Sequence, residues 1–206
     1  METILGLCIG VGLSAACGFR VFVPLLVMSI ATLMGWYEPA KGFEWLAIPA
    51  VCAALGFATI CEIAAYYVPW VDNLLDTIAT PAAVVAGTLS TMAVSSGEMS
   101  QFATWAAALI VGGGTAGVVQ MSTVAARGVS TATTGGLGNF VVATGELIGS
   151  IVLSILAFVM PVVITVFVII LVIVVARWVS QKKQEKISHS TSVSYTHLTL
   201  PTNSRV

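Results

Sequence analysis

The chain has 206 residues, of which 58% are hydrophobic and 8% are charged, and its formal net charge is −1. With a mean hydropathy of +1.02, this composition is typical of an integral membrane protein. It excludes the basic surface that a nucleic-acid partner would need. The length allows one membrane domain and no large soluble domain beside it. The lipid bilayer is therefore the expected partner, and no cofactor is predicted.

The apolar runs divide into about six membrane spans, since a spanning helix needs about 20 apolar residues. The first run, residues 3–34, is too long for one simple span. A glycine and an arginine interrupt it, so we expect a short first helix, a broken or re-entrant segment near residues 17–20, and a second helix over about 20–34. A polar loop over 36–44, flanked by aromatic residues, is typical of a membrane interface.

The middle of the chain predicts three further spans, over about 46–67, 81–94 and 102–126. A short segment over 68–80 carries polar residues and is expected to be a separate element. The next span would then begin at Pro81.

The last part of the chain predicts a second irregular segment and a long apolar region. The Ser/Thr/Gly-rich stretch over 128–139 is expected to be broken or re-entrant. The apolar run over 140–178 exceeds one span, and Pro161 is its natural break. The predicted fold class is therefore all-α, a polytopic transmembrane helical bundle of about six spans.

Basic residues at the C-terminal end predict the orientation. We assign residues 1–180 to the transmembrane domain and 181–191 to a basic cytoplasmic flank, because cytoplasmic flanks carry an excess of Lys and Arg. The chain is thus predicted to be a multi-pass protein of the bacterial inner (plasma) membrane with a cytoplasmic C-terminus. We interpret residues 192–206 as a non-native tail, because they resemble a translated adapter peptide found at the ends of unrelated chains.

Charged residues inside or against the apolar runs are the main functional signal, because charge within a membrane is costly. Threading the spans places all of them toward the cytoplasmic half, and there are six: Arg20, Glu62, Asp72, Asp76, Arg127 and Glu146. Glu62 and Glu146 are candidates for binding a cation or a proton. Arg20 could pair with one of these two glutamates or hold an anionic group, and pairing is the expectation. The alternatives are a purely structural ion pair, which applies to the whole set, and snorkelling of Arg20 to the membrane interface.

Asp72 and Asp76 are four residues apart, a spacing that puts both carboxylates on one helix face. Two hard oxygen ligands make a weak candidate site for a divalent metal ion, because such ions need more ligands. The alternative is that Asp72 caps a short interfacial helix and Asp76 is solvated.

The irregular stretch offers hydroxyl and amide groups at Thr133, Thr134 and Asn139. These groups could coordinate an ion, line a pore, or hold an anion beside Arg127. The alternative is a flexible cytoplasmic connection rich in turn residues.

Three motifs in the chain are distinctive: Ala16-Cys17-Gly18-Phe19-Arg20-Val21-Phe22-Val23-Pro24, then Pro69-Trp70-Val71-Asp72-Asn73-Leu74-Leu75-Asp76-Thr77-Ile78-Ala79-Thr80-Pro81-Ala82, and Ser130-Thr131-Ala132-Thr133-Thr134-Gly135-Gly136-Leu137-Gly138-Asn139. Together they resemble a bacterial integral membrane family catalogued as a domain of unknown function (DUF4126-like), and the resemblance covers about residues 5–175. It implies an inner-membrane location and supplies no activity.

Transport or conduction of a small solute or ion is the leading functional hypothesis, with the buried carboxylates as its sites. A non-transporting membrane scaffold or assembly factor is the alternative. A metal-dependent intramembrane lipid enzyme is the third, although an enzyme is less favoured because the histidines lie outside the apolar segments. The small size is compatible with a homo-oligomer.

Overall fold

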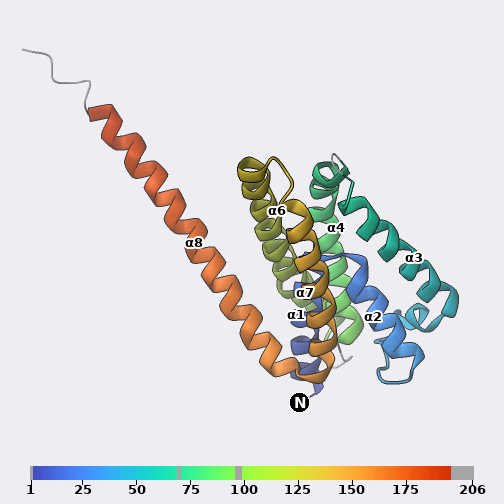
Figure 1. Ribbon diagram of the computed structural model, residues 1–206. Helices are drawn as coiled ribbons and strands as arrows, with labels where there is room; N and C mark the ends of the chain where they lie inside the picture. Colours follow the sequence, from blue (N-terminus) through green and yellow to red (C-terminus); the bar gives the residue numbers. More distant parts are fainter. Residues whose placement is uncertain (1, 69–70, 96–98, 196–206) are drawn as a thin grey trace, which may run out of the picture. The chain divides into compact units, whose positions relative to one another are not determined.

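The computed structural model describes residues 2–68, 71–95 and 99–195, without the side chains of residues 2–3, 72–74, 178–179 and 182–195. Over these residues the protein is all-α (Figure 1). The helices are, in chain order, α1 (Glu2–Phe19), α2 (Phe22–Leu33), the 3-10 helix η1 (Glu44–Ala47), α3 (Pro49–Tyr66), α4 (Val71–Val94), α5 (Gln101–Ala107), the π-helix η2 (Ala108–Gly113), α6 (Gly114–Thr134), α7 (Asn139–Val159) and α8 (Pro161–Tyr195).

Four helices in the described part of the chain are long and apolar enough to cross a membrane: Pro49–Tyr66, Leu75–Val94, Gln101–Thr134 and Asn139–Val159. The third of these joins α5, η2 and α6 into one continuous helix. Three more apolar helices are shorter: Ile4–Phe19, Phe22–Leu33 and Pro161–Arg177. The structure thus supports a multi-pass membrane protein with four candidate spans.

Helix α1 is the centre of the bundle and packs against α4, α6 and α7 (Figure 1). Buried hydroxyls hold these contacts: Ser14 Oγ donates to the carbonyl of Gly87 at 2.8 Å, and Ser150 Oγ donates to the carbonyl of Ala16 at 3.0 Å. Lipid tails are as apolar as leucine, so close packing and such hydrogen bonds, rather than hydrophobic burial, hold membrane helices together.

The π-helical turn η2 packs closely against α4. A Cβ added to Gly112 would meet Thr91 Oγ1 and lie 2.6 Å from the carbonyl oxygen of Gly87. Glycine is therefore required at this crossing, because any side chain would push the two backbones apart.

The expected interruption of the first apolar run lies at Arg20 and Val21, between α1 and α2, whereas residues 17–19, which were expected to belong to it, are helical and end α1. The expected break at Pro161 is also present, since α7 ends at Val159 and α8 begins at Pro161.

The prediction of a separate element over 68–80 was wrong, because α4 runs unbroken from Val71 to Val94 with Pro81 inside it. A proline within a helix removes one backbone hydrogen bond. Membrane helices tolerate this loss, because neighbouring helices and nearby polar groups satisfy the freed carbonyl.

The prediction of an irregular segment over 128–139 was largely wrong, because α6 continues to Thr134 and α7 begins at Asn139. The hydroxyls fit into the helix by donating back to carbonyls one turn earlier, as Thr133 Oγ1 does to Val129 at 2.9 Å and Thr134 Oγ1 does to Ser130 at 2.7 Å. The helix ends at Gly135, whose φ of +65° is left-handed and favours glycine.

The chain forms two compact units, Met1–Ile169 and Ile170–Val206. The first nine residues of α8 belong to the first unit, where Thr165 Oγ1 donates to the carbonyl of Cys8 at 3.0 Å. In the second unit, α8 remains helical through the predicted basic flank to Tyr195. The remainder of the predicted non-native tail, residues 196–206, lies outside the described residues.

Candidate functional site: a charge cluster at the break between α1 and α2

Side chains from five helices meet beside the break between α1 and α2. We call this group the charge cluster, and it consists of Arg20 at the end of α1, Glu62 and Tyr66 on α3, Asp76 on α4, Arg127 on α6, and Glu146 on α7. The structure therefore brings together five of the six charged residues that the sequence marked.

Arg127 is the hub of the charge cluster. Its Nε donates to Glu146 Oε1 at 3.1 Å, its Nη2 also donates to Glu146 Oε2, and its Nη1 donates to Asp76 Oδ1 at 2.5 Å. Two parallel bonds between a guanidinium and a carboxylate form the strongest common ion-pair geometry. The Arg127 and Glu146 side chains are 2% and 4% exposed, whereas Asp76 is 13% exposed, so Asp76 is the member of this trio nearest to solvent.

Arg20 pairs with Glu146, as one of the two sequence-based alternatives predicts. Its Nη2 lies 3.6 Å from Glu146 Oε2 and donates to the carbonyl of Ala143 at 2.8 Å. Its Nε and Nη1 are buried and have no hydrogen-bond partner among the described residues. Buried donors are rarely left without a partner, so these two atoms mark a place where the charge cluster can accept a further ligand.

Glu62 caps helix α2 instead of forming an arginine pair. Its Oε1 accepts the N–H of Val21 at 2.8 Å, and its Oε2 accepts the N–H of Phe22 at 3.1 Å. The first N–H groups of a helix lack intrahelical partners and carry partial positive charge, which favours a carboxylate there. The interruption between α1 and α2 thus leaves backbone N–H donors without helical partners, and Glu62 of α3 supplies the carboxylate that accepts from them.

Tyr66 is the member of the charge cluster that sequence reasoning missed. Its ring centroid lies 3.9 Å from Cζ of Arg20 and 4.1 Å from Cζ of Arg127, so both guanidinium groups stack on the same buried ring. Such cation–π contacts lower the cost of holding two like charges together. The sequence contained a signal for this position, because Tyr66 follows Glu62 by four residues and so lies on the same face of the helix as that candidate site residue.

A pocket of about 320 Å³ opens beside the charge cluster, lined by Asp76, Thr77, Val124, Arg127 and Gly128. The ion pair of Asp76 with Arg127 forms part of its wall. The charge cluster is therefore buried but accessible from one side.

The structure does not bring Thr133, Thr134 or Asn139 into the charge cluster. They lie at the turn between α6 and α7, where Thr134 Oγ1 accepts the N–H of Gly138 at 2.9 Å and Asn139 Nδ2 donates to Thr131 Oγ1 at 3.1 Å. These two hydrogen bonds are local, which indicates a role in closing the turn.

Asp72 lies in the first turn of α4, and its side chain is outside the described residues. Among the described side chains, no group of three or more His, Cys, Asp or Glu residues is placed to hold a metal ion. A metal site at Asp72 and Asp76, and with it the lipid-enzyme hypothesis, therefore stays a prediction.

The chain belongs to the DUF4126 family, described as a domain of unknown function, whose model matches residues 7–181. This confirms the family resemblance found in the three sequence motifs. No curated protein and no solved structure matches the chain.

Proposed function

We propose that this member of the DUF4126 family is a transport protein of the bacterial inner membrane that moves a small ion. In this proposal a proton or a small cation is bound and released at the charge cluster. The pocket beside Asp76 connects that site to the aqueous phase.

The charge balance of the charge cluster is the observation that carries the proposal. Among the described side chains, the charge cluster contains two guanidinium groups and three carboxylates, so these side chains carry one more negative formal charge than positive. A net charge within a membrane is costly, and one proton or one monovalent cation would remove it. The unpartnered Nε and Nη1 of Arg20 add donors for a water molecule that accompanies the ion.

Pro81 adds a backbone feature that suits ion binding. In an unbroken helix the carbonyl of Thr77 would accept the N–H of residue 81, which a proline lacks. Thr77 lines the pocket beside Asp76. A carbonyl without its helical N–H donor can coordinate a small cation, as the carbonyls of unwound membrane helices do in transporters.

The membrane arrangement remains part of the proposal. We propose about six spans, with the shorter apolar helices completing the four long ones. The Lys and Arg residues that follow the last apolar run support a cytoplasmic C-terminus, with Arg177 as the first of them. The charge cluster would then lie in the cytoplasmic half.

Ion flux into proteoliposomes tests the proposal. The full chain is reconstituted, and proton, sodium, potassium and chloride fluxes are measured with ion-sensitive dyes after an imposed gradient. We expect flux above that of empty liposomes and its loss in Asp76→Asn and Glu146→Gln. Glu44→Gln is the matched control, because Glu44 is exposed and its carboxylate accepts the nearby N–H of Gly42.

Two results would contradict ion transport. One is flux no greater than that of empty liposomes for all four ions. The other is equal flux in the wild type, Asp76→Asn and Glu146→Gln, with each variant shown to be folded by its unfolding temperature.

A membrane scaffold is the second candidate, and the hydrogen bonding of all three described carboxylates of the charge cluster supports it. Glu62, Asp76 and Glu146 each accept hydrogen bonds from described groups, as a purely structural network requires. In that case, removing Arg127 would lower stability and neutralising its partner Glu146 would restore much of it, without any ion flux to lose.

A further inference from the structure

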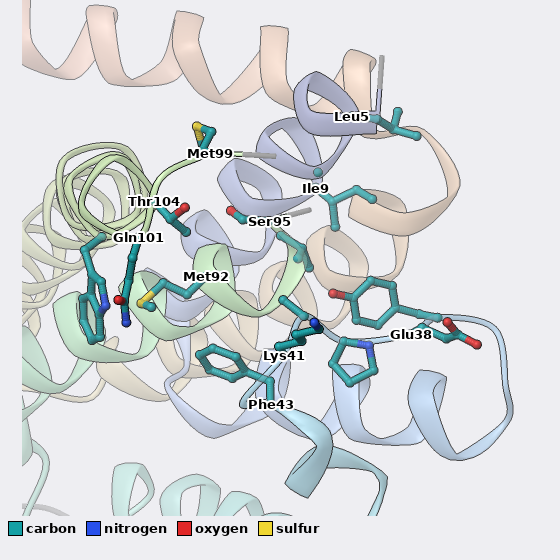
Figure 2. Close-up of a pocket in the computed structure, with 16 residues that line it drawn as sticks. Leu5, Ile9, Glu38, Lys41, Phe43, Met92, Ser95, Met99, Gln101 and Thr104 are labelled. Atoms are coloured by element: carbon teal, nitrogen blue, oxygen red, sulfur yellow. The ribbon is translucent and has the colours of Figure 1, made fainter. Parts of the chain in front are cut away.

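A second and larger pocket lies at the other end of α1. Its volume is about 720 Å³, within the usual range for ligand sites. It is formed by the start of α1, the loop before η1, the end of α4 and the start of α5 (Figure 2). Gly6, which lines it, precedes Arg20 by fourteen residues, or about 20 Å of helix, so this pocket is separate from the charge cluster.

The loop that forms one wall is fixed in place by the end of α4. The N–H of Ala40 donates to the carbonyl of Ala93 at 2.8 Å, and Tyr37 Oη donates to the same carbonyl. The ring of Tyr37 also lies 5.5 Å from that of Phe158. Because three contacts hold the loop, the pocket exists before any ligand binds.

One wall of the pocket is charged and another is apolar. Glu38 and Lys41 come from the fixed loop, are exposed, and form no ion pair with each other or with other described residues (Figure 2). Apolar side chains from α1, α4 and α5 and the segment before α5 also line the pocket: Leu5, Ile9, Met92, Met99 and Trp105. This lining suits a ligand with both a positive and a negative group at one end and an apolar body.

The pocket lies where a membrane boundary is expected. It is built from the ends of apolar helices, and an exposed aromatic residue adjoins its lining in the chain at two places: Trp36, which is 79% exposed, precedes Tyr37, and Phe102, which is 83% exposed, follows Gln101. Exposed aromatic side chains at helix ends are typical of the membrane–water interface. The amphipathic molecules found at that depth are the lipids of the bilayer.

We propose that this pocket binds the headgroup of an aminophospholipid, such as phosphatidylethanolamine. The carboxylate of Glu38 accepts hydrogen bonds from the primary ammonium, and the ammonium of Lys41 pairs with the phosphate. The glycerol and the first part of the acyl chains lie along the apolar wall, and the rest of the chains extend into the bilayer. This proposal does not depend on ion transport.

Lipid retention tests the proposal with two headgroups that differ only in methylation. The full chain is placed in nanodiscs of phosphatidylglycerol doped with a minor fraction of phosphatidylethanolamine or of phosphatidylcholine, and retained lipid is counted by native mass spectrometry. We expect phosphatidylethanolamine to be retained over phosphatidylcholine, whose trimethylated nitrogen cannot donate to Glu38. Glu38→Gln and Lys41→Gln should each lower retention at least about fivefold.

Matched variants separate headgroup binding from a general loss of charge. Glu44→Gln and Arg177→Gln remove an exposed acid and an exposed base outside the pocket and should retain the lipid. Lys41→Arg keeps the positive charge and should retain it as well. Unfolding temperatures confirm that each variant is folded.

Three outcomes would overturn the proposal. One is equal retention of the two lipids, and another is unchanged retention in both Glu38→Gln and Lys41→Gln. The third is displacement of the lipid by an equal concentration of soluble phosphoethanolamine, which would assign the pocket to a water-soluble zwitterion instead.

Discussion

Arg127 of α6 and Glu146 of α7 form a two-bond ion pair across the turn that joins their helices, although they are nineteen residues apart in the chain. Arg20, at the end of α1, lies 3.6 Å from the same carboxylate, at its Oε2 atom. Glu146 therefore links the α6–α7 pair to the central helix. Its position explains why charge can be kept in the interior of an apolar bundle, because each formal charge there has an opposite charge or a polar group beside it.

Removing Arg127 should destabilise the protein strongly. In Arg127→Gln, both Glu146 and Asp76 lose their closest cation, and breaking a buried pair costs about 3–5 kcal/mol. We expect the lower end of that range, because Arg20 remains near Glu146. Chemical denaturation in detergent micelles measures the free energy of unfolding. The double variant Arg127→Gln with Glu146→Gln should recover part of the loss, and a single variant as stable as the wild type would show that the pair contributes nothing.

The ring of Tyr66 should contribute more to the stability of the protein than its hydroxyl does. Tyr66→Phe keeps the surface on which both guanidinium groups stack, whereas Tyr66→Leu removes it. We expect Tyr66→Leu to lower the free energy of unfolding by about 2 kcal/mol more than Tyr66→Phe. The same denaturation assay compares the two variants. Equal losses would mean that the ring acts only as apolar bulk.

Two glycines close together in the chain should respond in opposite ways to substitution by alanine. Gly112→Ala places a Cβ 2.6 Å from the carbonyl of Gly87, so α4 and η2 must separate, at a cost of about 1–3 kcal/mol. Gly114→Ala meets no atom within 4 Å and should be neutral or stabilise the helix by up to about 1 kcal/mol. Thermal unfolding of both variants checks the contrast, and similar shifts would contradict the close crossing.

Tyr37 should make stability fall at high pH. Burial raises the pKa of its hydroxyl above the ordinary value of 10.0, and this effect outweighs the opposing one of the Ala40 backbone. The folded state therefore keeps the proton where the unfolded state loses it, so its stabilising contribution is complete below about pH 10 and decreases as the pH rises above that value. Tyr37→Phe removes a titrating group and should flatten this decrease. Unfolding temperatures of both proteins across the alkaline range provide the comparison, and parallel curves would contradict the prediction.

The positions of most helices could be predicted from the chain because they depend on local properties. The lengths of the apolar runs predict spanning helices, and the interruption at Arg20 and the proline at 161 predict where two of them end. Local pattern was misleading at Pro81 and at the hydroxyl-rich end of α6. Each contains residues that usually stop a helix, but the surrounding bundle and back-bonded hydroxyls allow the helix to continue.

By itself, the amino-acid sequence determined the membrane character of the protein, most of its helices, and the charged residues that needed partners. Only the tertiary structure decided the partners: Arg20 pairs with Glu146, Glu62 caps α2, and Tyr66 lies between two guanidinium groups. Apolar periodicity reports whether a segment is helical. It does not report how each helix is rotated and shifted against its neighbours, and those two variables set the distances between side chains on different helices.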